Sequence, residues 1–261
     1  MTKKINFSKF SSINIGAVIN VFMINSMKDC KTARENNSYL IGSCNNILMS
    51  NNPPPLCKLS KKYDYIKIEE NILKIGAATP SGKIASFCKK NNIANFEFMS
   101  HLPGTLGGLV YMNAGLKEYE IFNHLLSIMT CDAKILKENI EYGYRYTNLS
   151  ATILEASFEI EKGFDDAKVE MFKKMRANQP STPSAGSCFK NPKGDYAGRL
   201  IEEVGLKGKR VGGMEFSKEH ANFLVNHGNG TYDDANSLID KAKSLVKKVF
   251  GIELELEIKI L

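Results

Sequence analysis

The sequence contains no tryptophan, and its six cysteines include no Cys-x-x-Cys pair and no metal-ligand spacing with the four histidines. The common zinc motifs and the thioredoxin-like redox motif are therefore excluded. No run of about 18 apolar residues is present, so no membrane-spanning helix is expected. The N-terminal stretch MTKKINFSKFSS lacks the apolar core of a signal peptide. We therefore expect a cytoplasmic protein whose cysteines are free thiols.

The sequence also lacks a concentrated charge of either sign. Its 35 Lys and Arg exceed its 28 Asp and Glu, which gives a formal net charge of +7, but these residues are scattered over the whole length. No basic run is interleaved with aromatic residues, which argues against a nucleic-acid-binding module and is compatible with an enzyme for anionic ligands. With 261 residues, 43% of them hydrophobic, the chain can form one large domain or two to three smaller ones.

Apolar periodicity predicts strands and helices in separate runs. Strands are predicted at 13–24, 63–68, 71–77, 127–136 and 151–163, and strict alternation predicts a final strand over 252–261. Helices are predicted at 81–92 with Ser81 as cap, at 165–179, at 195–205 with Asp195 as cap, and at 235–249 closed by Gly251. The pattern indicates an α+β fold with a domain boundary near 160–166.

Two loops are rich in small residues: IGSCNNIL at 41–48 and HLPGTLGGLVYMNAG at 101–115. Glycine permits a close backbone approach, and successive N–H groups can surround an anion such as a pyrophosphate. Neither loop matches the Rossmann fingerprint or the P-loop. Either loop alone is more typical of a tight turn, but together they favour a phosphate-binding site of another kind.

The stretch SAGSCFKNP at 184–192 places the hydroxyl of Ser187 next to the thiol of Cys188. No Gly-x-Ser-x-Gly elbow surrounds Ser187, and nothing in the sequence around Cys188 indicates a lowered thiol pKa. If the segment is extended, Ser187 and Phe189 face one way and Cys188 the other. The residues alone leave open a thiol-dependent redox protein, a nucleotide-binding module and an enzyme that uses the serine.

Five segments occur in an order that resembles the UDP-N-acetylenolpyruvoylglucosamine reductase family. They are PGTLGGLVYMNAG, GYRYTNL, PSAGSCFKNPKGDYAGRLIEEVGLKGKRVGG, SKEHANFLVN and ELEIKI. The resemblance covers nearly the whole chain, and the lack of a long insertion resembles the shorter of the family's two types. It implies a two-part FAD-binding region of the vanillyl-alcohol-oxidase type, over 1–52 and 53–164, and an α+β substrate-binding domain over 165–261.

The resemblance implies an NADPH-driven, FAD-dependent reduction of UDP-N-acetylglucosamine enolpyruvate to UDP-N-acetylmuramate, a step of peptidoglycan precursor synthesis. It assigns FAD to the two loops, through Gly42, Asn45, Asn46, Pro103, Gly104, Thr105, Gly107, Gly108 and Asn113. In this family NADPH uses the substrate's site in turn, which would explain the missing dinucleotide fingerprint. We expect a monomer with no metal, no nucleic-acid partner and no membrane span.

The first loop departs from the family's pattern. Where the family has a Gly-Gly-Gly-Ser-Asn run, this chain reads Gly42-Ser43-Cys44-Asn45-Asn46. Two glycines are replaced, which bears on how closely this backbone can approach the cofactor. The second loop keeps its glycines.

The resemblance also assigns catalytic roles. Arg145 would hold the substrate carboxylate through two parallel hydrogen bonds. Ser187 would donate a proton to C2 of the enolpyruvyl group, and Glu257 would act as a neutral acid near the developing charge. Residues expected around the UDP moiety are Asn191, Arg176, His220 and, ranked lower because Asp195 would oppose an anion there, Tyr196.

Overall fold

The computed structural model describes all 261 residues, which divide into two compact units. Unit 1 consists of Met1–Lys3, Val21–Ser43 and Pro55–Ala177, and unit 2 of Lys4–Asn20, Cys44–Pro54 and Asn178–Leu261. Each unit therefore combines N-terminal segments with later ones. No helix has both the length and the hydropathy that crossing a bilayer requires.

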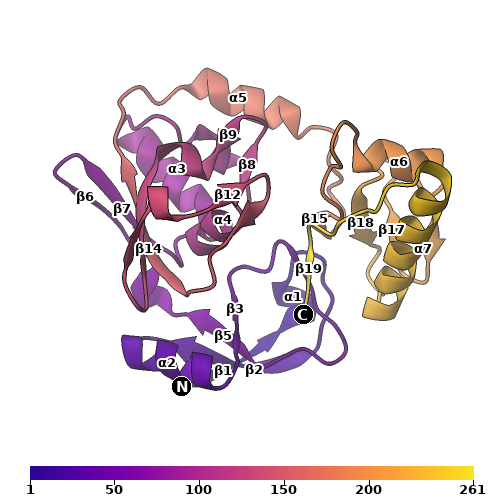
Figure 1. Cartoon of the computed structure of the whole chain (residues 1–261), viewed down its shortest axis with the longest axis horizontal. Helices are drawn as coiled ribbons and strands as arrows, with labels where there is room; N and C mark the ends of the chain where they lie inside the picture. The colour runs from indigo at the N-terminus through magenta and orange to yellow at the C-terminus, as the bar shows by residue number, and fades with distance from the viewer. The chain divides into compact units, whose positions relative to one another are not determined.

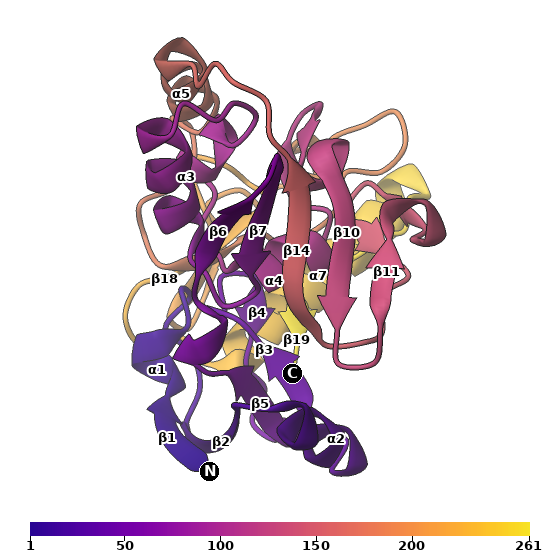
Figure 2. The same cartoon turned by 90° about the vertical axis from the view of Figure 1, so that its left-hand side faces the viewer.

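Unit 1 is built around an antiparallel five-stranded sheet (Figure 2). Its order is β11 (Lys134–Leu136), β10 (Leu125–Thr130), β14 (Ile153–Glu159), β7 (Ile72–Gly76) and β6 (Ile66–Glu69). In β14, Ala156 and Phe158 are fully buried, whereas Glu159 is exposed. The helices α3 (Ser81–Lys90), α4 (Leu106–Tyr111) and α5 (Asp166–Met175) supply further residues to the same apolar core. Strand alternation thus directs one face of the sheet toward the helices.

Parallel pairs of strands in a second, four-stranded sheet lead into the first predicted loop. β5 (Leu56–Leu59) pairs in parallel with β2 (Val18–Ile24) and with β3 (Tyr39–Ile41). Helix α2 (Met27–Glu35) connects β2 to β3, and its N-cap Ser26 accepts a hydrogen bond from the Asp29 amide. Because β3 ends at Ile41, the loop beginning with Gly42 emerges directly from this sheet.

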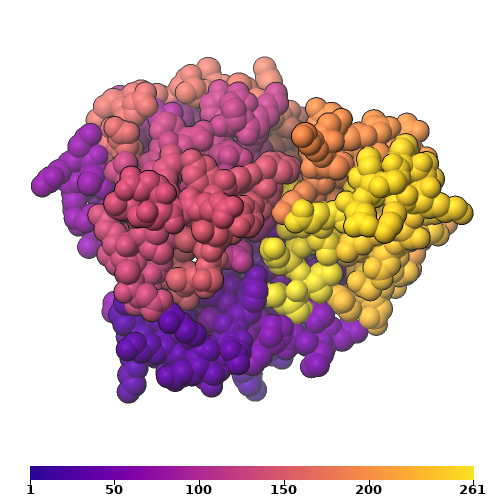
Figure 3. All heavy atoms as spheres, viewed as in Figure 1, coloured from indigo at the N-terminus to yellow at the C-terminus, as the bar shows by residue number.

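Unit 2 contains a four-stranded antiparallel sheet and, besides the one-turn helix α1 (Phe7–Phe10), two longer helices (Figure 1). The sheet order is β15 (Ser184–Ser187), β18 (Phe223–Asn226), β17 (Met214–Phe216) and β16 (Arg210–Val211). Helix α7 (Tyr232–Phe250) begins with a capping box between Thr231 and Asp234, and ends at Gly251 in the left-handed conformation. Figure 3 shows its yellow atoms lying against the orange atoms of the preceding segment of this unit. The other helix is α6 (Ala197–Glu203).

The remaining elements are short. They are β1 (Thr2–Asn6), α1 (Phe7–Phe10), β4 (Ile47–Leu48), η1 (Lys61–Tyr63), η2 (Glu97–Ser100), β8 (Gly115–Leu116), β9 (Tyr119–Glu120), η3 (Ile121–His124), η4 (Lys137–Asn139), β12 (Tyr142–Gly143), β13 (Tyr146–Thr147) and β19 (Lys259–Ile260). β19 pairs in parallel with β4 inside unit 2.

The α+β class, the strands at 63–77 and the stop at Gly251 are confirmed. Two predicted caps are wrong. Ser81 is the first helical residue, and the N-cap is Pro80, without a side-chain bond. Asp195 precedes the N-cap Tyr196, because its carboxylate instead binds the Arg199 guanidinium, with Nε to Oδ1 at 2.8 Å.

Two predicted strands are shorter than expected. The strand predicted over 13–24 begins only at Val18. Over 252–261 the alternating pattern pairs only at Lys259–Ile260 and at one isolated bridge, Phe189 with Leu256. The periodicity of a strand is present there, but a strand also needs a neighbour along its length, which β4 provides for two residues only.

Candidate functional site

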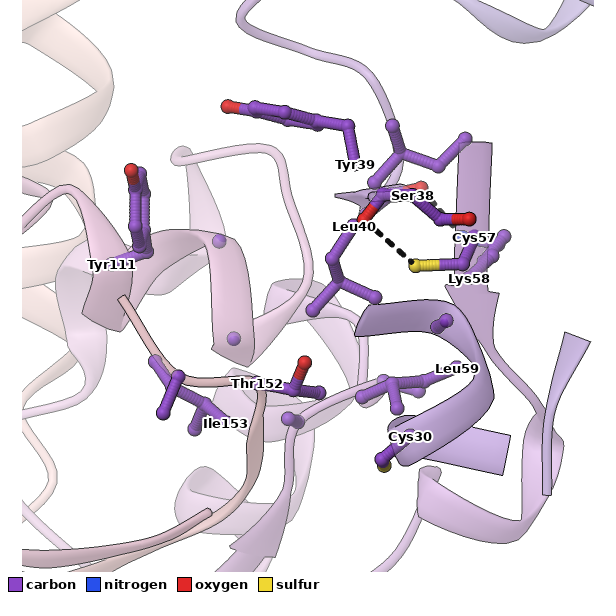
Figure 4. A pocket seen from close by; sticks show the side chains of 18 of the residues that line it. Cys30, Ser38, Tyr39, Leu40, Cys57, Lys58, Leu59, Tyr111, Thr152 and Ile153 are labelled. Carbon is purple, nitrogen blue, oxygen red and sulfur yellow. Dashed lines mark hydrogen bonds between the residues drawn. The ribbon is translucent and has the colours of Figure 1, made fainter. Parts of the chain in front are cut away.

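Unit 1 contains a pocket of about 290 Å³ that joins the two predicted loops (Figure 4). Gly42 of the first loop and Thr105, Gly107 and Gly108 of the second all line it. The rings of Tyr39 and Tyr111 and the side chains of Leu40, Leu59, Thr152 and Ile153 contribute to its lining. Glycine backbone beside apolar and aromatic walls is the combination expected for a ligand with both a phosphate and a ring.

The glycines of the pocket have separate structural reasons. A Cβ on Gly42 would lie 2.6 Å from Thr105 Oγ1, so only glycine lets the two loops approach this closely. A Cβ on Gly107 would lie 3.1 Å from Ala77 Cβ. A Cβ on Gly108 would meet no atom within 4 Å, so its backbone borders open space in the pocket lining.

Two other predicted cofactor residues act on the loop itself. Gly104 has φ +151 and accepts a hydrogen bond from the Ser81 amide, 3.0 Å, which ties the loop to the start of α3. Neither Gly104 nor Pro103 lines the pocket. They belong to the turn that leads into Thr105, the N-cap of α4.

The thiols at the pocket are protonated at neutral pH. Burial raises the pKa of Cys30 to about 12, with a hydrogen bond to Cys131 as the next cause. Burial also raises the pKa of Cys57 to about 11. A thiolate is the reactive form of cysteine, so these groups act as small apolar wall residues. This observation argues against thiol-dependent redox chemistry in the pocket.

Asn113 is completely buried, and its side chain is used within the protein. Its Nδ2 donates to Glu120 Oε2 (2.8 Å) and to the Gly143 carbonyl (3.0 Å), and its Oδ1 accepts from the Phe122 amide (3.3 Å). Both donors and the acceptor therefore have protein partners. The asparagine connects the end of the second loop to the hairpin that carries Arg145.

Arg145 occupies the second position of the two-residue turn between β12 and β13. Its φ is 54°, in the left-handed region, which costs an ordinary residue roughly 1–2 kcal/mol. Its Nη2 donates to the Gly115 carbonyl at 2.8 Å, and its Nη1 to the Asn113 carbonyl at 3.5 Å. A strained backbone held by such contacts is common at functional sites.

Ser187 ends β15 in unit 2, where the pairing with β18 shifts register between Ser184 and Ser187. Ser187 is partly exposed, whereas Cys188 and Phe189 are both fully buried in the same core. The amide of Phe189 donates to Asn222 Oδ1 (3.0 Å), and Asn222 Nδ2 donates back to the Phe189 carbonyl (2.8 Å). These bonds hold the backbone just beyond the end of β15.

Cys188 is a packing residue, as its burial shows, and burial raises the pKa of its thiol well above the usual range. Its carbonyl accepts a hydrogen bond from the Glu257 amide at 2.9 Å. Asn46 Nδ2 in turn donates to the Glu257 carbonyl, also at 2.9 Å. Three predicted site residues of unit 2, Ser187, Glu257 and Asn46, are therefore held in adjoining backbone segments.

The altered first loop adopts the conformation that glycine would favour. Cys44, which replaces one of the family's glycines, has φ 55° and is 3% exposed. Its carbonyl accepts from the Ser12 amide at 3.2 Å. Next to it, the Asn45 carbonyl oxygen lies 4.0 Å from the place of a Cβ on Gly186. A cysteine with a buried side chain therefore forms the left-handed turn at this position.

The four predicted substrate residues have different environments. Asn191 is exposed, and its Oδ1 accepts from the Ala197 amide (3.1 Å), which is the bond that Asp195 was expected to make. His220 is half-buried, and burial lowers its pKa. Tyr196 is 70% exposed. Arg176, at the C-cap of α5, belongs to unit 1, whereas the other three belong to unit 2.

Comparison with known proteins gives a consistent family. The model of the UDP-N-acetylenolpyruvoylglucosamine reductase C-terminal domain matches residues 178–261. A UDP-N-acetylenolpyruvoylglucosamine reductase of Helicobacter hepaticus is 46% identical over 100% of this chain and 99% of its own length. One of Campylobacter jejuni is 44% identical over 98% and 99%. The chain belongs to the UDP-N-acetylenolpyruvoylglucosamine reductase family.

A solved reductase of this family, from Thermus caldophilus, matches the fold with a TM-score of 0.87 at 25% identity. The match covers 100% of this chain and 98% of that one. As a member of the family, the chain is an FAD-dependent, NADPH-driven reductase of enolpyruvyl-UDP-N-acetylglucosamine. The pocket fits such a cofactor, because glycine backbone and aromatic walls occur side by side in it.

Several residues of the site were not found from the sequence. Lys58 lines the pocket, and its Nζ donates to the Gly42 carbonyl at 2.5 Å. Asn222 and Glu120 hold the segments of Ser187 and Arg145. A lysine in a strand and single polar residues between apolar ones give no signal of their own, because such residues are usually solvated.

Proposed function

We propose that Ser187, Arg145 and Glu257 carry the reduction of the enolpyruvyl group in this chain. The observation that supports this most directly is the 2.9 Å hydrogen bond from the Glu257 amide to the Cys188 carbonyl. It holds the C-terminal glutamate beside the peptide that follows the serine. Two groups that act on neighbouring parts of one substrate need such a fixed relation.

The pocket of unit 1 is the proposed place of FAD. Gly42, Thr105, Gly107 and Gly108 would hold it directly, since they line the pocket. Pro103, Gly104, Asn45, Asn46 and Asn113 would act by fixing the two loops. When bound, FAD supplies hydride transfer between NADPH and the substrate.

Each catalytic side chain has a separate task. Arg145 binds the substrate carboxylate and stabilises the negative charge that develops on it during reduction. Ser187 delivers a proton to C2, which is basic enough at that stage to take it from a hydroxyl. Glu257, protonated beside the substrate carboxylate, donates a hydrogen bond to that group.

The region 165–261 is proposed to bind the UDP-sugar, with 1–52 and 53–164 forming the two parts of the cofactor region. Asn191 and His220 are the better candidates for the UDP moiety, because both lie near the Ser187 segment. His220 Nδ1 accepts from the amide of Asn222 at 3.3 Å, and the side chain of Asn222 bonds Phe189 of that segment. Arg176 is half-buried, and burial lowers its pKa, so a pairing anion there would be favourable. Tyr196 remains the weakest candidate. We place the protein in the cytoplasm as a monomer.

A two-step anaerobic titration tests the proposal. NADPH should bleach the bound flavin, and enolpyruvyl-UDP-N-acetylglucosamine should restore its absorbance. The same titration with Arg145→Ala should bleach normally and recover far more slowly. Normal recovery in Arg145→Ala would contradict the assigned role of this residue, and no recovery in the wild type would contradict the substrate.

A further inference from the structure

The Arg145 guanidinium lies beside a carboxylate that has no role in the assignments above. We propose that Glu120 is a positioning residue for Arg145, and that Asn113 holds Glu120 for this purpose. The proposal rests on the proposed role of Arg145 and adds the groups that determine its orientation.

Glu120 lies close to the guanidinium of Arg145. It ends β9 of the β8–β9 hairpin, and its Oε1 lies 4.0 Å from Arg145 Nη1. The two side chains are only 22% and 16% exposed. A carboxylate and a guanidinium at this distance interact by charge, and partial burial limits the screening of that charge by water.

The second step is the fixation of this carboxylate. Glu120 Oε2 accepts from Asn113 Nδ2 at 2.8 Å. Asn113 cannot turn away, because its side chain is also bound to the Gly143 carbonyl and the Phe122 amide and is fully buried. The glutamate therefore has one of its two oxygens held by the protein while the other faces Arg145.

The third step is the way in which Arg145 is held. Its Nη2 and Nη1 donate to the carbonyls of Gly115 and Asn113, at the end of the second loop. The residues of this network therefore come from the Asn113 loop, the β8–β9 hairpin and the Arg145 turn. Carbonyls fix the guanidinium plane by hydrogen bonds, and Glu120 adds an attractive charge on one side. A guanidinium whose plane is fixed in this way faces a substrate carboxylate in one orientation.

Glu120→Gln tests this role, because it keeps an oxygen for Asn113 and removes the charge beside Arg145. Glu118→Gln is the matched control: it lies two residues away on the same hairpin, is exposed and undergoes the same charge change. Both half-reactions are measured by stopped-flow absorbance of the flavin on folded, flavin-loaded protein. We expect Glu120→Gln to slow reoxidation by the substrate about tenfold and to leave reduction by NADPH within twofold. Glu118→Gln should leave both unchanged.

A double variant separates positioning from a general structural role. Glu120→Gln combined with Arg145→Ala should reoxidise no more slowly than Arg145→Ala alone, because the positioned group is already absent. The proposal would be overturned if the two substitutions slowed reoxidation independently, so that their effects multiplied in the double variant. It would also be overturned if Glu120→Gln slowed both half-reactions equally or slowed neither. If Arg145→Ala itself reoxidises normally, the role of Arg145 fails and the proposal fails with it. A different outcome is normal reoxidation in Glu120→Gln together with slow reoxidation in Arg145→Ala. That outcome overturns the positioning role of Glu120 alone.

Discussion

The Arg145 hairpin of unit 1 and the Ser187 segment of unit 2 are each held by a buried asparagine, but by different means. Asn113, which is fully buried, bonds a backbone carbonyl, a backbone amide and the carboxylate of Glu120. Asn222, 3% exposed, bonds only backbone groups of Phe189 through its side chain. One proposed catalytic residue therefore has a charged neighbour in its network, whereas the segment of the other is held by neutral hydrogen bonds.

The difference corresponds to the tasks of the two residues. A guanidinium is always ionised, so a neighbouring carboxylate can orient it through charge at a distance of 4.0 Å. A serine hydroxyl is neutral, and a nearby charge would compete with the proton transfer expected of it. Hydrogen bonds between the backbone and the neutral side-chain amide of Asn222 hold this segment without placing a charged group beside it. The predictions below test this contrast in order of expected effect.

Ser187→Ala should give the largest effect. It removes the proposed proton donor but leaves the hydrogen bonds that Cys188 and Phe189 make in this segment. We expect flavin reduction by NADPH to stay within twofold and substrate-dependent reoxidation to fall by several orders of magnitude, measured by stopped-flow absorbance. Reoxidation within tenfold of the wild type would remove Ser187 from the mechanism.

Asn222→Ala and Asn113→Ala should both be strongly destabilising. Each leaves buried backbone groups unpaired: the amide and carbonyl of Phe189 in one case, the Phe122 amide and Gly143 carbonyl in the other. An unpaired buried group costs about 1–3 kcal/mol, and the loss should be measured by urea unfolding followed by circular dichroism.

The two alanine variants should differ in their response to salt. Asn113→Ala also removes the hydrogen bond that holds Glu120, so the charge pair of Glu120 and Arg145 becomes more exposed to solvent. The rate of flavin reoxidation in this variant should therefore depend on ionic strength. Asn222→Ala should show the salt dependence of the wild type. An identical salt response of the two variants would erase the contrast between the charged and the neutral anchor.

Cys188→Ala should change stability but not chemistry. The thiol is fully buried, and its raised pKa keeps it protonated, so removing it creates a small cavity in the core of unit 2. We expect the free energy of unfolding to fall by about 1 kcal/mol and both half-reactions to stay within twofold. A tenfold loss in either half-reaction would restore the thiol as a functional candidate.

The smallest expected effect concerns pH and the neighbour of Asn222. Burial is the main cause that lowers the pKa of His220 below its usual 6.5, and the Asn222 amide donates to its Nδ1. His220 therefore binds a proton more readily in the unfolded chain than in the folded one. The stability that comes from burying the neutral imidazole is complete above about pH 6.5, and it is lost as pH falls through the lower pKa of the folded state. Urea unfolding at pH 7.5 and 5.5 should show a smaller drop for His220→Gln than for the wild type. Equal drops would show that His220 does not titrate with unfolding.

The sequence predicted best what depends on local chemistry. Helix α7 was predicted from its apolar spacing, and its end from Gly251, because a left-handed C-terminal residue is a local requirement. The motif around Ser187 led us to propose this segment as catalytic, and the structure gives the segment a hydrogen-bonded setting. Motifs and caps of this kind involve residues close together in the chain.

What the sequence did not predict depends on distant partners. The alternation of 252–261 was read as a long strand, but its pairing is short: β4 pairs with two residues, and Leu256 forms an isolated bridge with Phe189. The backbone of Phe189 is in turn bonded by Asn222, which lies 33 positions away. No pattern within a short window contains these partners. The wrong cap at Asp195 has a different reason, because its competitors are close in the chain: Arg199 binds its carboxylate, and Asn191 bonds the Ala197 amide.

The pairing of β4 with β19 also determines when unit 2 can fold during synthesis. Asn46 bonds the Glu257 carbonyl across 211 residues, and the Ser50 amide donates to the carbonyl of the last residue, Leu261. At the usual 5–20 residues per second, the early segment must wait on the order of 10–40 s before its partner strand exists. Unit 2 can therefore close only after residues 257–261 have been synthesised. Ribosome-bound chains halted before residue 250 should leave Cys44–Pro54 open to proteolysis, whereas released chains should protect it.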